Sequence, residues 1–182
     1  MKNHTIILEE INKVLDSVNE NDIDAFINYI LKSRNIVTCG AGRVGYSIRG
    51  FCMRLGHFGF KANHIGDTCV PSIGKGDLFL VASGSGETQT IFDLTQIAKS
   101  NGANVFLITG NKNSRIAKLA DVLLLLEAPS KTKEIKGFKS LQPMTTLNEQ
   151  CLGILLDTVV LEIMKKTGES HETMWKRHSN LE

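Results

Sequence analysis

The sequence has almost no net charge and no cysteine motif. Its Lys and Arg residues number 21 and its Asp and Glu residues 19, so the formal net charge is only +2. A charge this balanced does not favour binding to nucleic acid or to an anionic membrane, and we expect neither partner. The four cysteines form no CxxC pair and have no histidine at ligand spacing. We therefore expect reduced thiols and no metal site.

Long apolar segments are also missing. The N-terminus lacks the apolar stretch of a signal peptide. The longest purely aliphatic run, 122–126, is far shorter than the roughly 20 residues that span a bilayer. We therefore expect a soluble, cytoplasmic protein. The length of 182 residues fits a single domain, 1–182, with no internal repeat.

What the sequence does contain is an alternation of short apolar runs with amphipathic segments. Near-continuous apolar strands separated by helices are typical of a parallel sheet covered on both faces. The sequence thus predicts the α/β class, with a doubly wound five-stranded parallel sheet flanked by helices. The expected strands are 35–39, 60–65, 78–83, 104–109 and 122–126. The expected helices are 5–19, a second one capped by Asp22 and ending near 33, then 44–55, 89–100, 114–120, 146–166 and 170–178, with a loop at 127–144.

A cluster of glycines and hydroxyls follows the third expected strand. In an open parallel sheet, ligands bind beyond the carboxyl ends of the strands. Glycines there let backbone N–H groups approach an anion, and the N-terminus of the next helix adds unpaired donors. No Lys follows as in a nucleotide triphosphate loop, so the cluster predicts a site for a phosphate monoester. The alternative is helix capping, with Ser85 as the N-cap and Thr88 three residues later. The residues of the cluster are Ser83, Gly84, Ser85, Gly86, Glu87 and Thr88.

A second glycine cluster, GAGRVG, follows the first expected strand and matches the GxGxxG pattern of dinucleotide sites. The acidic residue of that pattern lies about 20 positions on, but here it could only be Asp67, 27 positions beyond Gly40. An arginine inside the turn also suits a sugar or a phosphate monoester better than a pyrophosphate. We therefore favour a substrate-binding turn, with Gly42 and Arg43, over a dinucleotide site.

Two residues are candidates for acid–base chemistry. Glu149 lies in the first turn of the long helix expected at 146–166. It is either a catalytic base or the third residue of a capping box with Thr146, and spacing alone favours the capping box. His178 ends the last expected helix. A histidine there is most often solvated, and only neighbours in the fold or in an oligomer would make it catalytic.

The sequence resembles the 6-phospho-3-hexuloisomerases, a family of sugar isomerase (SIS) domain proteins, over nearly its whole length. The resemblance implies a SIS fold, a flavodoxin-like three-layer sandwich. It also implies a homotetramer in which the opening helices (5–33) and the closing helices (146–178) pack on the sheet and between subunits. The implied reaction converts D-arabino-hex-3-ulose 6-phosphate into D-fructose 6-phosphate without a cofactor, in the ribulose monophosphate pathway of formaldehyde fixation or, in reverse, in pentose synthesis. The matching segments are VTCGAGRVG, FCMRLGHFGF, IGDTCVPSIGKGDL, SGSGET, IAKLADV, the QPM and NEQ pieces, LDTVVLEIM and RHSNLE.

The resemblance also implies residue roles. It puts the phosphate on 83–88, the base at Glu149 in place of the capping box, and a partner acid at His178 of a neighbouring subunit. One position departs from the family pattern GAGRSG, because Val44 stands where the substrate-binding serine is expected. A missing hydroxyl contact weakens binding by about 1 kcal/mol, and Ser47, one turn on, is the candidate replacement. The alternatives left open are another SIS-type sugar-phosphate isomerase and a non-catalytic sugar-phosphate-binding regulator.

Overall fold

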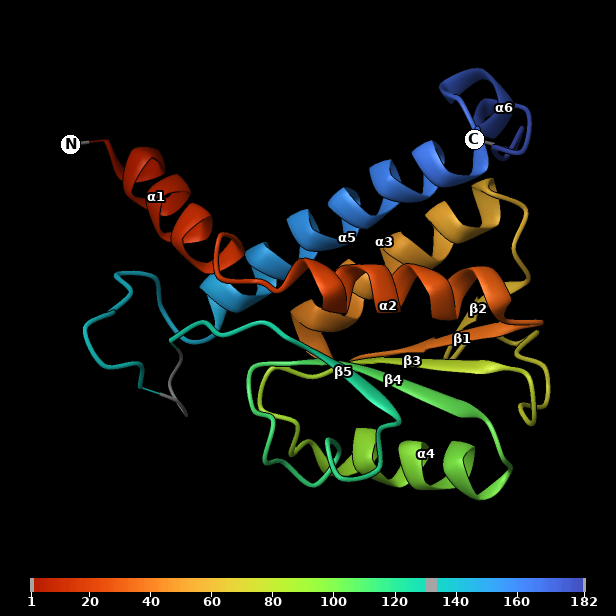
Figure 1. The fold of residues 1–182 in the computed structure, drawn as a ribbon, viewed down its shortest axis with the longest axis horizontal. Helices are drawn as coiled ribbons and strands as arrows, with labels where there is room; N and C mark the ends of the chain where they lie inside the picture. The colour runs from red at the N-terminus through yellow and green to blue at the C-terminus, as the bar shows by residue number, and fades with distance from the viewer. Residues whose placement is uncertain (1, 130–133, 182) are drawn as a thin grey trace.

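A computed structural model describes residues 2–129 and 134–181 of the chain (Figure 1). Its centre is one sheet of five parallel strands in the order β2-β1-β3-β4-β5. The predicted doubly wound α/β class is therefore confirmed. All five strands fall within the expected apolar runs: β1 (Ile36–Cys39), β2 (Ala62–His64), β3 (Leu78–Ala82), β4 (Asn104–Thr109) and β5 (Val122–Leu125).

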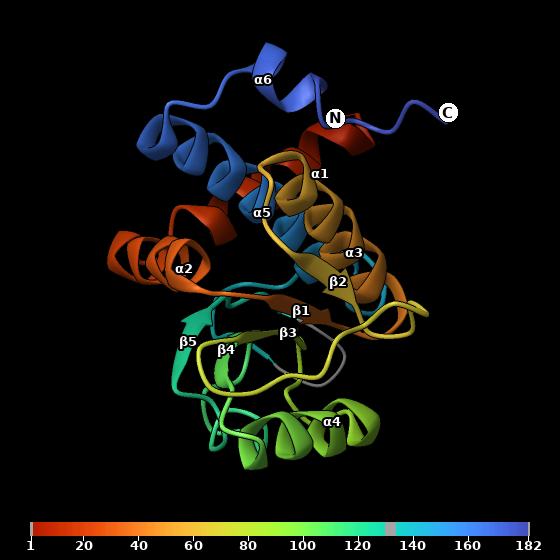
Figure 2. The same cartoon turned by 90° about the vertical axis from the view of Figure 1, so that its right-hand side faces the viewer.

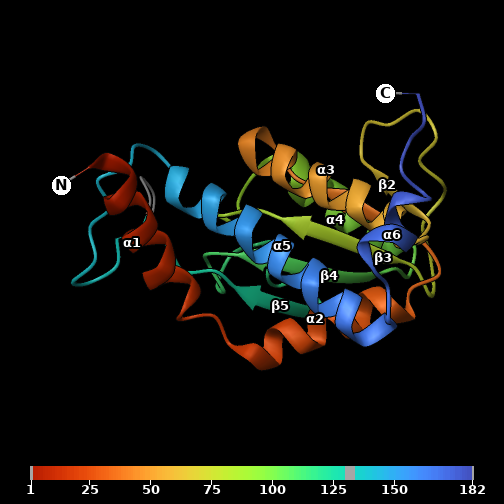
Figure 3. The ribbon, with the colours of Figure 1, turned by 90° about the horizontal axis from the view of Figure 1, so that it is seen from above.

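Helices cover both faces of the sheet (Figure 2). α2, α3 and α5 lie on one face and α4 lies on the other. Seen from above, α3 and α5 run side by side, and α1 crosses near the N-terminal end of α5 (Figure 3). The short α6 follows α5 at the C-terminal end of the chain. The helix bounds are α1 (Asn3–Leu15), α2 (Glu20–Lys32), α3 (Gly42–His57), α4 (Gln89–Ser100), α5 (Thr146–Thr167) and α6 (His171–Trp175).

Alternate residues of the central strands enter two separate apolar cores. In β3, Leu78 and Leu80 belong to the core under α2, α3 and α5, whereas Phe79 and Val81 belong to the core against α4. All four side chains are buried. A strand that is buried on both faces has no polar side, which is why its sequence is a continuous apolar run.

The helix expected at 114–120 is not formed. This segment is a succession of turns in which Ser114 and Ile116 are fully buried. The backbone N–H of Arg115 binds the Glu87 carboxylate, and that of Ile116 binds the Gly86 carbonyl oxygen. The apolar residues of the segment thus belong to turns that are hydrogen-bonded to the glycine loop 83–88, and not to a helix.

Three helix boundaries differ from those expected by three residues or more, and others by one or two. The first helix ends at Leu15, earlier than 19. The second begins at Glu20 and is capped by Asn19, whose side chain accepts a hydrogen bond from the Asn21 N–H, and not by Asp22. The last helix ends at Trp175, so the chain beyond it forms a turn.

The segment expected as a loop at 127–144 contains no helix or strand in its described residues, apart from an isolated bridge between Ile135 and Phe138. Its residues 130–133 lie outside the described part. Within 2–129 and 134–181, no helix has the length and apolar character needed to cross a membrane. The same residues contain no group of three His, Cys, Asp or Glu side chains arranged to hold a metal ion.

Candidate active site

The candidate site lies at the carboxyl ends of the strands, where β1 and β3 are neighbours. The chain leaves β1 for α3 on one face of the sheet and leaves β3 for α4 on the other. Because these connections depart in opposite directions, the loops open a crevice between them, which is the usual ligand position in such sheets. The two glycine clusters of the sequence, 40–45 and 83–88, form its two sides.

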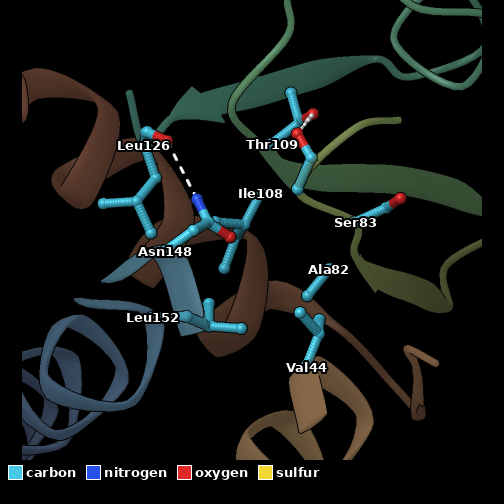
Figure 4. Close-up of a pocket in the computed structure, with 9 residues that line it drawn as sticks. Val44, Ala82, Ser83, Ile108, Thr109, Leu126, Asn148 and Leu152 are labelled. Carbon is cyan, nitrogen blue, oxygen red and sulfur yellow. Dashed lines mark hydrogen bonds between the residues drawn. The ribbon is translucent and has the colours of Figure 1, made fainter. Parts of the chain in front are cut away.

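A small inner pocket lies between these loops (Figure 4). Val44 faces it from the start of α3, and Asn148 faces it from the first turn of α5. Asn148 is buried, and its Nδ2 donates a 3.2 Å hydrogen bond to the Leu126 carbonyl oxygen. The pocket therefore joins the ends of β3, β4 and β5 to both helices. Its lining residues are Val44, Ala82, Ser83, Gly84, Ile108, Thr109, Leu126, Asn148 and Leu152.

Two glycines of the loop 83–88 lie against neighbouring side chains. Gly86 has a φ of +65°, and a Cβ there would lie 2.0 Å from the Ser114 Oγ. At Gly84, a Cβ would lie 2.9 Å from the Asn148 Oδ1. A larger residue at either position would displace the loop or its neighbour, so the two glycines allow the close approach of this backbone to Ser114 and Asn148.

The loop ends at the N-terminus of α4, whose N-cap side chain does not cap it. Thr88 is the N-cap residue, but its side chain makes no capping hydrogen bond. The alternative in which Ser85 caps this helix is wrong, because the Ser85 Oγ accepts from the Glu87 N–H at 3.2 Å, before the helix starts. The Ser83 Oγ accepts in the same way from the Gly86 N–H at 3.2 Å. An uncapped first turn presents N–H donors and a partial positive charge, the features that bind phosphate.

Glu87 is held by Arg115 on the segment after β4. The Glu87 Oε2 lies 2.7 Å from the Arg115 Nε, and Oε1 accepts from the Arg115 backbone N–H at 2.9 Å. The hydrogen bonds of this guanidinium hold the pKa of the Glu87 carboxyl below its usual range. The carboxylate thus ties the loop to its neighbour, and a direct contact of Glu87 with substrate stays a prediction.

Glu149 faces an open outer pocket beside the inner one. Its Oε2 lies 3.1 Å from the Arg43 Nε, and its Oε1 accepts a 2.8 Å hydrogen bond from the Thr145 hydroxyl. Because Thr145 is the N-cap residue and Thr146 the first residue of α5, the capping box between Thr146 and Glu149 is not formed. The side chain of Glu149 is only 12% exposed and is oriented by its two partners.

Consecutive residues of α3 and α5 divide between the two pockets. Arg43 and Glu149 line the outer pocket, whereas their neighbours Val44 and Asn148 line the inner one. The two pockets are therefore adjacent parts of one site, with the glycine loop 83–88 on one side and the pair of Arg43 and Glu149 on the other. The outer pocket is lined by Ile11, Arg43, Ser47, Glu149, Gln150, Gly153, Ile154 and Asp157.

Gly42 and Ser47 lie on either side of Arg43 in the chain. Gly42 has a φ of +59°, and a Cβ there would meet no atom within 4 Å, so its conformation and not crowding calls for glycine. The Ser47 hydroxyl donates to the Arg43 carbonyl oxygen at 3.5 Å and lines the outer pocket. Ser47 therefore faces Arg43 and not the inner pocket lined by Val44.

His178 is distant from Glu149 within one chain. It follows α6 and lies beside His57, with 3.2 Å between the His178 Nδ1 and the His57 Nε2. Arg43, the partner of Glu149, is fourteen residues from His57 on α3, a separation of about 21 Å along a helix. One chain thus brings Glu149 to the two glycine loops, but it does not bring His178 there.

The sequence does not predict two side chains of this site. Asn148 enters the inner pocket only because α5 turns that face towards Leu126, a long-range contact that no local motif signals. The Thr145 hydroxyl binds the Glu149 carboxylate. Because Thr145 and Thr146 are consecutive, the sequence does not show which of the two is the N-cap residue. That one-residue difference changes the partner of the Glu149 carboxylate from a backbone N–H to a hydroxyl.

Comparison with known proteins shows what kind of domain this is. The SIS domain model matches residues 29–152. The chain belongs to the SIS domain family. A 3-hexulose-6-phosphate isomerase of Bacillus subtilis (strain 168) is 38% identical over 97% of this chain and 95% of that protein. One from Mycobacterium gastri is 34% identical over 99% of this chain and 90% of that protein.

The solved structures agree with this SIS domain assignment. A crystal structure from Methanococcus jannaschii, whose description infers the molecular function of 3-hexulose-6-phosphate isomerase, has a TM-score of 0.83 and 34% sequence identity, and covers 98% of this chain and 96% of that chain. The resemblance to the 6-phospho-3-hexuloisomerases is thereby confirmed. The SIS domain match includes both glycine loops and Glu149 but ends before α6 and His178.

Proposed function

We propose that this chain is a cytoplasmic isomerase that interconverts D-arabino-hex-3-ulose 6-phosphate and D-fructose 6-phosphate. The main support is one crevice of a SIS domain with an uncapped helix N-terminus behind a glycine loop on one side and the carboxylate of Glu149 on the other. The first binds a phosphate, and the second moves a proton. The activity is the one named for the relatives in Bacillus subtilis and Mycobacterium gastri. It would serve formaldehyde fixation through ribulose monophosphate.

The substrate phosphate binds to the loop 83–88. The first N–H groups of α4 and the partial positive charge of its N-terminus stabilise the dianion. The hydroxyls of Ser83 and Ser85 each accept a backbone N–H within the loop, so each retains its own O–H to donate to a phosphate oxygen. With the phosphate held at this end, the sugar carbons extend towards Glu149.

Glu149 is the base. Moving a carbonyl from C3 to C2 requires removal of the proton on C2 and delivery of a proton to C3 through a cis-enediol. One carboxylate above both carbons performs both transfers, taking the proton from C2 and returning it to C3. Arg43 and Thr145, each bonded to one carboxylate oxygen, hold Glu149 in a single orientation, the positional requirement of such a base. The reaction so written needs no metal, nucleotide or redox cofactor.

His178 carries protons between the two oxygens. As C2 loses its proton, the carbonyl oxygen on C3 must gain one, and the hydroxyl on C2 must later lose one. An imidazole is suited to this exchange near neutral pH. Since His178 lies far from Glu149 in its own chain, it acts in the site of a neighbouring subunit.

Exposed apolar side chains on α3 and α5 support such an assembly. Tyr46 and Met53 lie seven residues apart on α3 and are 77% and 47% exposed. Ile154 and Leu161 lie seven apart on α5 and are 41% and 58% exposed. A spacing of seven keeps each pair on one face of its helix, and exposed apolar faces of this kind mark contacts with another protein. The proposed occupant is a second copy of the chain in a homotetramer.

A coupled assay tests the reaction. The 3-hexulose phosphate is generated from ribulose 5-phosphate and formaldehyde, the protein is added, and fructose 6-phosphate is measured. Rapid, enzyme-dependent formation of fructose 6-phosphate is expected. Absence of product, with turnover of another ketose or aldose phosphate, would assign the site to a different sugar-phosphate isomerase.

The role of Glu149 is tested by Glu149→Gln. This variant should lose turnover by at least about 10²-fold, the usual contribution of a general base, while inorganic phosphate still binds. Full activity of this variant would show that Glu149 has only a structural role. Mixing the inactive Glu149→Gln and His178→Gln variants under conditions of subunit exchange should restore part of the activity, because some sites then contain both native residues. No recovery would mean that each site is built within one chain.

A further inference from the structure

Three nitrogen-bearing side chains form a hydrogen-bonded series at the C-terminal end of α3. Arg54 and His57 belong to the segment MRLGHFGF, which the mechanism above leaves unused. The Arg54 Nη1 lies 3.3 Å from the His57 Nδ1, and the His57 Nε2 lies 3.2 Å from the His178 Nδ1. His57 is 7% exposed. The chain following α6 thus lies over the end of α3 (Figure 1).

The chemistry of arginine fixes the direction of both hydrogen bonds. A guanidinium donates and never accepts, so the His57 Nδ1 must accept from Arg54. A neutral imidazole that accepts at Nδ1 carries its only hydrogen on Nε2. His57 therefore donates through Nε2 to the His178 Nδ1, which accepts. By the same rule, the ring hydrogen of neutral His178 is on Nε2.

Other neighbours hold the His178 ring in place. The Trp175 ring stacks on it with 5.0 Å between centroids. Arg177 donates from Nη1 to the His57 carbonyl oxygen at 3.0 Å and pairs with Glu169 at 2.9 Å, which anchors the terminal segment. The ring is thus restrained both by its stacking partner and by the hydrogen bond at Nδ1.

We propose that Arg54 and His57 are positioning residues that hold His178 in the tautomer whose Nε2 carries the proton, ready to donate to a substrate oxygen. This role rests on the proposed function of His178. In the forward reaction, the Nε2–H bond breaks as the bond from hydrogen to the oxygen on C3 forms, while Glu149 takes the proton from C2. The hydroxyl on C2 then returns a proton to Nε2 as Glu149 protonates C3. Atoms and charge balance over the cycle, and a neutral imidazole is known to serve as such a donor.

The tautomer is measured directly by ¹⁵N NMR of the full-length protein labelled in histidine, with the His178 signals assigned from the His178→Gln variant. The expected pattern near neutral pH is a protonated Nε2 and an unprotonated Nδ1. In His57→Phe, which removes the donor, the pattern should change to a mixture of tautomers. A protonated Nδ1 in the wild-type protein, or an unchanged pattern in His57→Phe, would overturn the inference. This measurement needs no turnover, so it tests the effect of His57 on the His178 tautomer even if the coupled assay shows no product.

Kinetics separate positioning from a merely structural role. His57→Phe should lower kcat by about 10- to 100-fold, because loss of the correct tautomer removes the proton donor from most molecules. KM should stay within about threefold of the wild-type value, because the loop 83–88 is unchanged. His57→Gln, whose amide N–H replaces the Nε2 donor, should recover most of this loss. If His57→Phe keeps the wild-type kcat while His178→Gln loses it, His57 has no positioning role although the proposed function stands.

A matched control uses another histidine of the same pocket. His171 lines the pocket with His57 and His178 and stacks on Trp175 with 6.1 Å between centroids, but it is outside the hydrogen-bonded series. His171→Gln should leave both kcat and the His178 tautomer unchanged. An equal loss of kcat in His171→Gln and His57→Phe would show that the effect comes from general disturbance of the C-terminal segment, and would refute the role of His57.

Discussion

The glycine at position 86 provides the sharpest test of the phosphate loop. Replacing Gly86 by alanine puts a Cβ 2.0 Å from the Ser114 Oγ and 2.5 Å from the Ser114 Cβ, at a φ of +65°. Ser114 is fully buried, and rotation about its Cα–Cβ bond would move the Oγ but not the Cβ. The left-handed backbone costs an L-residue about 1–2 kcal/mol, and overpacking of a buried site adds about 1–3 kcal/mol. Gly86→Ala should therefore lower the free energy of unfolding by about 2–5 kcal/mol.

Two companion variants separate these contributions. Gly42→Ala has a similar φ, +59°, with no atom within 4 Å of the new Cβ, so it should show the backbone cost alone, about 1–2 kcal/mol. Adding Ser114→Gly to Gly86→Ala removes the clashing side chain and should recover the overpacking part in a double-mutant cycle. Urea unfolding gives the free energies. The increase in melting temperature caused by inorganic phosphate reports on the loop, and it should be lost in Gly86→Ala but kept in Gly42→Ala. Equal destabilisation by the two single variants would refute the close approach of Gly86 to Ser114.

Three further variants test other parts of the molecule. Val44→Ser adds a hydroxyl to the inner pocket and should lower KM for the sugar phosphate about fivefold, the equivalent of about 1 kcal/mol; an unchanged KM would mean that the substrate does not reach Val44. The hydrogen bonds from Arg34 lower the pKa of the Asp77 carboxyl to about 2, which stabilises the fold above about pH 4, by about 2 kcal/mol. The difference in the free energy of unfolding between wild type and Asp77→Asn, measured by urea unfolding, should therefore shrink as the pH falls from 4 to 2. A difference that does not change with pH would contradict this. Gly50 is exposed on α3 with no atom within 4 Å of a new Cβ, so Gly50→Ala should stabilise an isolated chain by about 1 kcal/mol but weaken the proposed tetramer in sedimentation velocity. Unaltered assembly would argue that this face is not an interface.

The sequence predicts the sheet well because each strand is a short apolar run between turn residues. The bounds 104–109 and 89–100 match β4 and α4 in the structure, since Gly102 and Gly110 bound these elements. The prediction for segment 114–120 fails for the opposite reason, because the Ile116 side chain is buried in the core against α4 while its backbone is bonded to the distant glycine loop. Local periodicity reports that a residue is buried and not which element buries it.

The site is predictable where a motif is local and not where partners come from distant segments. The glycines and hydroxyls of 83–88 follow each other in the chain, so the sequence alone predicts them as one candidate phosphate loop. The pairing of Arg43 with Glu149 joins residues 106 positions apart, and that of His57 with His178 joins residues 121 apart. The packing of α3 against α5 and the contact of its last residue with the segment after α6 bring these pairs together.

α3 links the two chemical groups of the proposed mechanism. Its first turn holds Arg43 against the base Glu149, and its last residue, His57, holds the proton carrier His178. A helix is stiff, so these two ends stay about 21 Å apart, too far for both groups to act on one sugar within a single chain. The proposed mechanism therefore requires each chain to contribute its base to one site and its histidine to another. It follows that an assembly with the α3 face buried is a requirement of the proposed chemistry, and that subunit dissociation should abolish turnover while phosphate binding to each separate chain persists.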